Sequence, residues 1–382
     1  MSVTDDIAPI HVFLISLEIT ERTSLGKQTV SIGFKMALHW GICSAGKISH
    51  DFVCALSTLD PTLHSVMAVA ARSAERSRKF AELHQIPKSY ASYEELASDD
   101  SIDIVYIGSI NTEHLSLSKL FLNHNKNILC EKPMALNVKQ LTEIQSLAKE
   151  KNLFCMEAVW SQFFPIYQKI REIIASREIG EVQIAQATFC LPILTKDHVA
   201  MKELGGGVMY SLGMYTAQFA MMVFGDETPK SVSVSGHLTP EGVDSGANIT
   251  LLYPNNKMAT LVYSGICRMS NVAEVGCTEG KIKIYPFWCP THMEVTHTKT
   301  GRTDQFQFPL PDSKVKPFYD NATGLRHEAE AVRQAINDGK KEHPLMSHEA
   351  SKKLATFVEL VRNSLGYVIE GDIASQLSIS KL

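Results

Sequence analysis

The feature that most constrains the fold is a regular alternation of apolar, strand-like runs with helix-like segments in the first part of the chain. Charged segments of helix length separate five apolar runs, which lie at residues 37–42, 64–71, 102–108, 128–130 and 153–156. Strands that alternate with helices in this way are joined by right-handed crossovers and build a parallel sheet. The alternation therefore predicts an α/β class with a doubly wound domain over residues 36–157.

The pattern changes after Trp160. A helix is predicted at 165–176 and an apolar helix at 208–223, and strand-like runs follow at 182–189, 231–236, 247–252, 259–263, 272–275 and 281–285. Asn255-Asn256 is typical of a hairpin turn. Residues 158–382 are therefore predicted to form an α+β domain with a large, open, mostly antiparallel sheet. The helices near 324–337 and 347–365 are expected to pack back on the first domain.

Composition excludes several classes of protein. A chain of 382 residues with 45% apolar residues is expected to form about two soluble domains. The net charge of −4 and the lack of a basic tract argue against a nucleic-acid or membrane partner. The eight cysteines stand singly, which indicates buried thiols in a reducing compartment and predicts neither disulfides nor a metal site.

The two ends of the chain carry separate expectations. Residues 1–35 show no clear periodicity, and we expect a poorly ordered N-terminal extension. The chain ends in Ser380-Lys381-Leu382, which matches a receptor-read peroxisomal address. A peroxisomal location is the expectation, with a cytoplasmic location as the alternative.

The turn after the first strand is placed to hold a dinucleotide pyrophosphate. A usual fingerprint there is Gly-x-Gly-x-x-Gly/Ala, and this chain has Ser44, Gly46 and Ser49 at those positions. Backbone N–H groups at the start of the next helix, including those of Lys47 and Ile48, favour an anion. An ordinary tight turn is the alternative interpretation.

The end of the second strand predicts the choice of cofactor. An NAD site would place an acidic residue there, whereas this chain has Arg72, Ser73 and Arg76. The two arginines can pair with a 2′-phosphate, and Ser73 can donate to it. These residues favour NADP over NAD.

Two further strand ends meet at the same edge of the predicted sheet. The third strand contains Tyr106 and leads into Asn111 and His114, and the fourth ends in Glu131-Lys132-Pro133. Ligands of open α/β sheets bind outside the carboxyl ends of the strands, so Lys132 is placed to hold a cofactor or to tune an acid. An ordinary solvated lysine and a structural histidine are the alternatives.

Several motifs together resemble the glucose–fructose oxidoreductase / inositol dehydrogenase family. They are the Asn-x-x-His and Glu-Lys-Pro motifs and the stretches 156–165, 205–215 and 318–329. The last three stretches look like the dimeric dihydrodiol dehydrogenases, a branch also described as NADP-dependent D-xylose dehydrogenases. The resemblance covers the chain from about residue 36. It implies a Rossmann domain, an open sheet used for homodimerisation, and metal-independent chemistry.

The resemblance also implies roles for individual residues. Lys132 matches the cofactor-holding lysine, Tyr215 the proposed acid/base, and Tyr106 and His114 positions linked to coenzyme binding. The chain departs from the pattern at Ser211, where an aspartate is usual. It also has Gln162 where an arginine is usual.

Simple chemistry supports the tyrosine and lysine pair. A free tyrosine has a pKa of about 10, and a nearby ammonium group lowers it. We therefore expect Lys132 to lower the pKa of Tyr215. The alternative for Tyr215 is a half-buried core residue on an apolar helix.

The aromatic residues Trp160, Phe189 and Trp288, together with Ser211, are predicted to form a substrate pocket. The sequence thus predicts an NADP-dependent dehydrogenase acting on a small molecule, either a vicinal diol or an aldose such as D-xylose. The alternatives are another sugar or cyclitol dehydrogenase and a non-catalytic NADP-binding sensor or scaffold.

Overall fold

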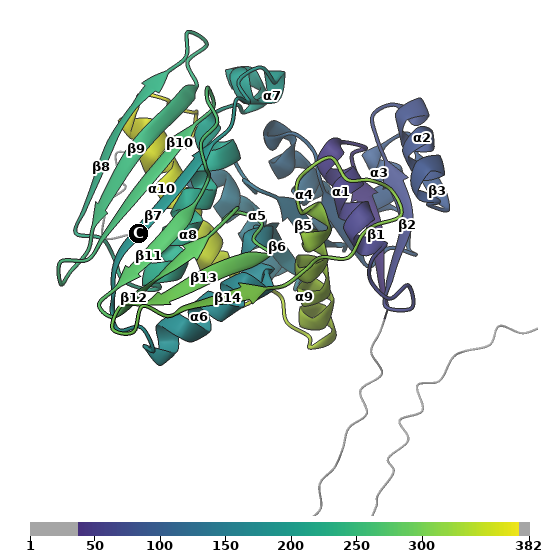
Figure 1. Ribbon diagram of the computed structural model, residues 1–382. Helices are drawn as coiled ribbons and strands as arrows, with labels where there is room; N and C mark the ends of the chain where they lie inside the picture. Colours follow the sequence, from purple (N-terminus) through teal and green to yellow (C-terminus); the bar gives the residue numbers. More distant parts are fainter. Residues whose placement is uncertain (1–36, 374–382) are drawn as a thin grey trace, which may run out of the picture. The chain divides into compact units, whose positions relative to one another are not determined.

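A computed structural model describes residues 37–373 of the chain (Figure 1). The predicted N-terminal extension and the C-terminal tripeptide lie outside the described residues. Within the described part, no helix has both the length and the apolar content that a membrane span requires.

The first sheet is fully parallel, as the alternating pattern predicts. Its six strands run in the order β3-β2-β1-β4-β5-β6, the order of a doubly wound dinucleotide-binding domain. The strands are β1 (Leu38–Cys43), β2 (His64–Ala70), β3 (Lys88–Tyr90), β4 (Ile104–Ile107), β5 (Asn127–Glu131) and β6 (Cys155–Ala158).

Helices connect these strands and begin where the sequence supplies caps. The side chains of Ser73, Ser92 and Asn137 each accept a backbone N–H in the first turn of a helix. The helices are α1 (Lys47–Leu56), α2 (Ala74–His84), α3 (Tyr93–Ala97), α4 (His114–Asn123) and α5 (Val138–Glu150), with a 3₁₀ turn η1 (Asn111–Glu113) before α4.

The second sheet has eight strands in the order β14-β13-β12-β11-β7-β10-β9-β8. Neighbouring strands are antiparallel except for β7 and β10, which are parallel. The strands are β7 (Val182–Cys190), β8 (Ser231–Leu238), β9 (Asp244–Leu252), β10 (Met258–Ser264), β11 (Ala273–Cys277), β12 (Gly280–Ile284), β13 (His292–His297) and β14 (Thr303–Gln307). Asn255 and Asn256 both adopt positive φ in the β9–β10 hairpin, as a primed turn requires.

The remaining helices lie between and beside the sheets. They are η2 (Trp160–Phe163), α6 (Pro165–Ser176), α7 (Asp197–Ala200), η3 (Lys202–Leu204), the π-helix η4 (Met209–Gly213), α8 (Met214–Phe224), η5 (Ala322–Gly324), α9 (Leu325–Asn337) and α10 (His348–Ser364). Helix α8 packs on β7, whereas α9 contacts α1 and α10 contacts α5. One hydrophobic core joins the sheets, from Trp40 and Tyr106 to Ala185 and Ile249.

Two features of the fold differ from the sequence prediction. Strands β3, β13 and β14 and helix α3 lie in segments for which no element is predicted. The apolar helix predicted from residue 208 is two elements, because its first turn, η4, is a π-helix. Such turns are frequent at functional sites, and η4 contains Ser211.

Candidate active site

The turn after β1 opens into a cavity of ≈610 Å³, here called the coenzyme cavity. Ser44 has φ +85°, so the turn keeps the left-handed conformation that favours glycine although serine occupies it. Gly46 is the N-cap of α1 and brings no side chain to cap its N–H groups. Ser44, Gly46, Lys47 and Ile48 all line the cavity, as expected for a phosphate-binding turn.

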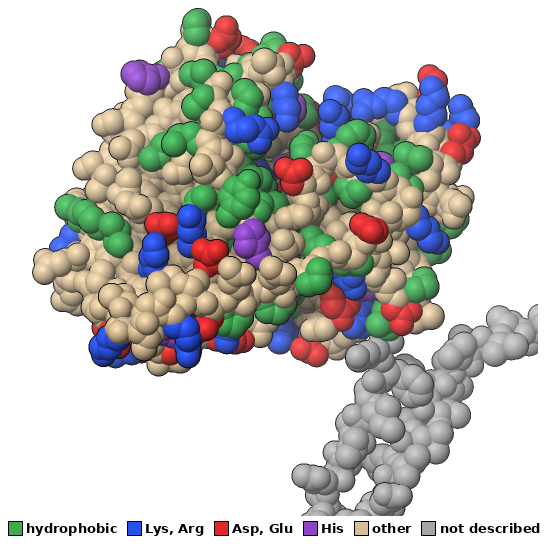
Figure 2. All heavy atoms as spheres, viewed as in Figure 1, with side chains coloured by type: hydrophobic (Ala, Val, Ile, Leu, Met, Phe, Trp, Pro, Cys, Tyr) green, Lys and Arg blue, Asp and Glu red, His purple; other side chains and the backbone are tan. Residues whose placement is uncertain are grey.

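Basic side chains border the same cavity. Arg72 and Arg76 line it, and Arg76 also donates from Nη2 to the Ala45 carbonyl at 3.4 Å, which ties it to the turn. Ser73 is the N-cap of α2, where its hydroxyl accepts from the Arg76 N–H. Figure 2 shows basic side chains on both sides of the hollow between α7 and α2. The uncapped helix start and the two arginines fit an anionic dinucleotide.

A second cavity of ≈260 Å³, the substrate cavity, adjoins the first. The residues that line both cavities are Ile48, Ser109, Asn111, Lys196, His198 and Tyr319. Trp160, Phe189 and Trp288 line the substrate cavity only, and the rings of Phe189 and Trp288 stack at 4.2 Å between centroids. The aromatic slot that the sequence predicts is therefore present next to the coenzyme cavity.

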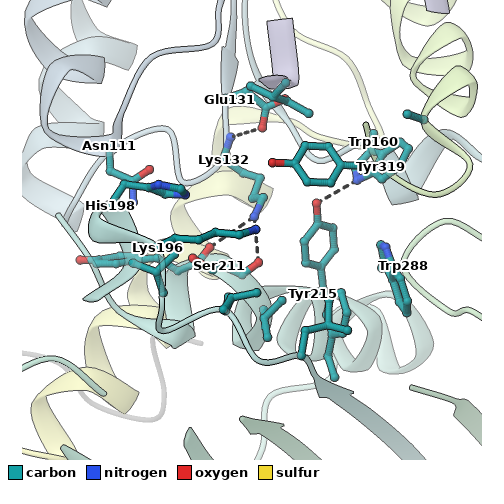
Figure 3. Close-up of a pocket in the computed structure, with 18 of the residues that line it drawn as sticks. Asn111, Glu131, Lys132, Trp160, Lys196, His198, Ser211, Tyr215, Trp288 and Tyr319 are labelled. Atoms are coloured by element: carbon teal, nitrogen blue, oxygen red, sulfur yellow. Dashed lines mark hydrogen bonds between the residues drawn. The ribbon is translucent and has the colours of Figure 1, made fainter. Parts of the chain in front are cut away.

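Lys132 crosses from the parallel sheet to the π-helix. It follows β5, and its Nζ donates to the Ser211 carbonyl at 2.9 Å while lying 4.6 Å from the centre of the Tyr215 ring (Figure 3). Burial lowers the pKa of Lys132 to about 8, against the opposing effect of Glu131 and Glu157. The lysine is thus mostly charged at neutral pH, and its pKa lies only slightly above that pH.

Tyr215 enters the substrate cavity from α8. Its hydroxyl oxygen accepts the Trp160 indole N–H at 2.8 Å, so within the described residues its own hydrogen stays available to a ligand (Figure 3). Burial raises the pKa of Tyr215 well above 10, with a further rise from Glu131. This corrects the prediction that Lys132 lowers it. The ammonium lies over the ring and not beside the hydroxyl, and desolvation outweighs its charge.

Tyr106 and His114 lie behind the cavity walls. The Tyr106 hydroxyl donates to Glu131 Oε1 at 2.5 Å, and both residues are fully buried. The His114 ring nitrogens lie 2.7 Å from the Pro133 carbonyl and 3.2 Å from the Ser109 carbonyl. Neither side chain lines the coenzyme cavity or the substrate cavity, and both support residues at the cavity walls. They fix Glu131, Ser109 and Pro133, which end the strands at the cavity.

The two departures from the family motifs lie in different places. Ser211 lines the substrate cavity, where its carbonyl accepts from Lys132. Gln162 lies outside both cavities, and its side-chain and backbone oxygens accept from Arg171 Nη2 at 2.6 and 2.7 Å. Of the two departures from the family motifs, only Ser211 therefore lies in the candidate active site.

Sequence reasoning missed several polar residues of the site, and three of them carry titratable side chains into both cavities. Lys196, His198 and Tyr319 line both cavities. Burial lowers the pKa of His198, and Lys196 and Lys132 lower it further, so His198 faces the cavity as a neutral imidazole. Lys196 precedes the short helix α7 and His198 lies in it, in a segment without a sequence signal, whereas Tyr319 falls inside the motif at 318–329.

Comparison with known proteins connects this geometry to a family. The profile of an oxidoreductase family with an NAD-binding Rossmann fold matches residues 38–159, and the GFO/IDH/MocA C-terminal domain profile matches 167–283. The chain is 41% identical over 338 residues to trans-1,2-dihydrobenzene-1,2-diol dehydrogenase of Danio rerio, covering 88% of this chain and 99% of that protein.

Two solved structures share the fold. KijD10, a 3-ketoreductase from Actinomadura kijaniata in complex with NADP, superposes with a TM-score of 0.73 at 21% identity, covering 86% of this chain and 97% of the other. Levoglucosan dehydrogenase in complex with NADH gives 0.74 at 16% identity, covering 86% and 97%. The family expected from the motifs is confirmed: the chain belongs to the GFO/IDH/MocA family of oxidoreductases, which use a nicotinamide dinucleotide.

Proposed function

We propose that the chain is an NADP-dependent dehydrogenase that oxidises a vicinal diol, such as a trans-dihydrodiol of an aromatic ring, or an aldose such as D-xylose. The observation that carries the proposal is the Tyr215 hydroxyl in the substrate cavity, bonded to Trp160 of the aromatic slot, in a cavity that adjoins the coenzyme cavity. The slot can cover a ring or a sugar face. The similarity to trans-1,2-dihydrobenzene-1,2-diol dehydrogenase of Danio rerio supports the same class of substrate.

Different residues of the site are proposed to bind the cofactor and to transfer the proton. Ser44, Gly46 and Lys47 would hold phosphate at the start of α1, and Lys132 would hold the cofactor's hydroxyl groups. A bound oxidised nicotinamide would supply the hydride acceptor and positive charge in the cavity. Tyr215 first has to lose its own phenolic proton to solvent, a step that the positive charges of Lys132 and the oxidised nicotinamide would favour. The phenolate oxygen, which the Trp160 N–H stabilises, would then take the alcohol proton and become the neutral phenol again.

A substrate panel tests the proposal. The full-length protein is incubated with NADP and a set of dihydrodiols, aldoses and cyclitols, and NADPH formation is followed by absorbance. Turnover of a diol or an aldose is the expected result, whereas turnover of cyclitols alone would move the assignment to a cyclitol dehydrogenase. The serine at position 211 favours one other candidate, a non-catalytic sensor. Tight NADP binding without turnover of any substrate would support that candidate.

The preference for NADP over NAD is assigned to Arg72 and Arg76. Charge-assisted hydrogen bonds are each worth about 1.5–3 kcal/mol, so Arg72→Ala/Arg76→Ala is expected to weaken NADP binding by roughly that amount per arginine. NAD binding should be nearly unchanged. Arg78→Ala is the matched control, because Arg78 also lies on α2 but pairs with Glu82 at the surface. Equal loss of both cofactors in a titration would contradict the assignment.

A homodimer is proposed from the form of the second sheet. Helix α8 covers one face of this sheet through β7 and β10, and exposed apolar side chains including Leu252 and Met269 lie on its strands and connections. Sedimentation equilibrium is expected to give twice the chain mass. A monomer at micromolar concentration would contradict the proposal.

A further inference from the structure

The structure brings three metal-ligand types together away from the active site. His50 and Cys54 lie one turn apart on α1, and His84 is the last residue of α2. One ligand atom from each lies within 4.8 Å of the other two. None of the three lines the substrate or the coenzyme cavity. The sequence predicts no metal site, and these three residues meet only through the packing of α1 against α2, which their spacing does not reveal.

The hydrogen bonds of His50 fix which nitrogen is free. Its Nε2 lies 3.1 Å from the Lys316 carbonyl, and a carbonyl only accepts, so Nε2 carries the hydrogen. Nδ1 then presents a lone pair toward His84 Nε2, 3.0 Å away. A histidine whose outer N–H is held by a carbonyl, with the other nitrogen turned toward further ligands, is the usual arrangement around a protein-bound metal.

The other two residues offer donor atoms of the kinds that Zn²⁺ takes, an imidazole nitrogen from His84 and a sulfur from Cys54. A metal ion binds the thiolate, so its binding would displace the Cys54 proton. His50 and Cys54 are buried and His84 is partly exposed, which leaves an entry path.

We propose that His50, Cys54 and His84 form a binding site for a borderline-soft divalent cation, with Zn²⁺ as the ion of choice. Two imidazole nitrogens and one thiolate suit Zn²⁺, whereas Mg²⁺ and Ca²⁺ prefer oxygen. Zn–N bonds of about 2.0–2.1 Å in a tetrahedral site put two nitrogens roughly 3.3 Å apart. The two nitrogens at 3.0 Å need to open only slightly. The fourth position is left for water.

The site is enclosed by residues 308–321, here called the strap, which join β14 to η5. The strap contacts the cluster through the Lys316 carbonyl, 3.1 Å from His50 Nε2, and through the Phe318 ring, whose centre lies 4.7 Å from that of the His50 ring. Bound Zn²⁺ would therefore clamp α1, α2 and the strap together. It should raise the thermal midpoint of the full-length protein, as any ligand of the folded state does.

Cobalt is the probe, because Co²⁺ occupies Zn²⁺ sites and a bound thiolate gives it a charge-transfer band. The chelator-treated full-length protein is expected to bind one equivalent of Co²⁺ with this band, to exchange it for Zn²⁺, and to release one proton per metal between pH 7.5 and 9. Cys54→Ser should abolish the band, and His84→Gln should weaken binding at least tenfold. Cys267→Ser, at an exposed cysteine outside the cluster, should retain both.

Each result decides the proposal. Absence of the band in the unchanged protein, or a band that survives Cys54→Ser, would overturn it. Circular dichroism checks that the variants fold. If Cys54→Ser fails to fold, the His84→Gln titration decides, because His84 is partly exposed at the end of its helix. Unchanged Co²⁺ affinity in that variant would also overturn the site.

Discussion

One hydroxyl group, that of Tyr215, determines whether the substrate cavity can move a proton. Tyr215→Phe removes this group and little else, so cofactor binding is expected to persist while the rate falls roughly 10²–10⁴-fold, the usual contribution of a general acid/base. Tyr319→Phe is the matched control, since Tyr319 lines the same cavity and its loss should cost less than tenfold. Steady-state rates and cofactor titrations measure both. A Tyr215→Phe enzyme at the unchanged rate would exclude Tyr215 from the reaction.

Lys132 makes the same cavity sensitive to alkaline pH. Burial lowers its pKa to about 8, so the ammonium is present below that pH and is lost as pH rises through it. Affinity for the anionic NADP is therefore expected to fall as pH rises from about 7 to 9. In Lys132→Arg the charge persists, and this decline should flatten. Fluorescence titrations across the range compare the slopes. An equally steep decline in the variant would show that another group titrates.

Residue-level properties of the site were predictable only in part. Lys132 and Tyr215 belong to motifs, so their meeting was foreseeable. The raised pKa of Tyr215 was not, because burial depends on packing that the sequence does not display. Lys196 and His198 were missed for a related reason. They belong to α7 and the residue before it, a segment without a sequence pattern, and only the folded chain brings this segment to the cavity.

At the scale of elements, strands that form an apolar run were easier to predict than short, exposed strands. Strands buried on both faces, such as β4 and β5, appear in the sequence as apolar runs. In contrast, β3 and β14 are sheet edges, with side chains mostly partly or fully exposed and no apolar run to reveal them. The π-helix was missed because its composition does not differ from that of an α-helix.

The strap depends on one carboxylate of α1. The two Asp51 oxygens accept the backbone N–H groups of Phe318 and Tyr319, each at 2.8 Å, and Asp51 is fully buried. Asp51→Ala removes both acceptors. Because hydrogen bonds to charged groups are worth about 1.5–3 kcal/mol, we expect a stability loss of at least that size and a raised KM as Tyr319 loses its position.

Denaturant unfolding and substrate kinetics measure these two effects of Asp51→Ala. Asp60→Ala is the control, since Asp60 caps only a local turn at Thr62. Unchanged KM together with lost stability would show that the strap holds the fold but does not position Tyr319.

At the scale of the whole molecule, the packing that joins the two sheets determines the geometry of the site, because the site contains residues attached to both sheets. Lys132 follows the parallel sheet and Tyr215 packs on the other, so their distance depends on this packing. The buried side chain of Arg362, on α10, contacts residues on both sides of this packing. Its guanidinium donates to the Leu136 carbonyl at 3.3 Å, pairs with Asp372 at 3.1 Å, and lies 5.2 Å from the centre of the Tyr210 ring.

Loss of Arg362 is therefore expected to act on the whole protein. Arg362→Ala leaves the Asp372 carboxylate buried without its partner, and breaking such a pair costs about 3–5 kcal/mol. The residues around it join Leu136, next to α5, to η4, so the two sheets should also unfold less cooperatively. Calorimetry should show a lower midpoint and a broadened or split transition. Arg177→Ala is the control, because Arg177 pairs with Glu181 at the surface, where a pair is worth about 0–1 kcal/mol. A single sharp transition at the unchanged midpoint in Arg362→Ala would show that the apolar core alone couples the sheets.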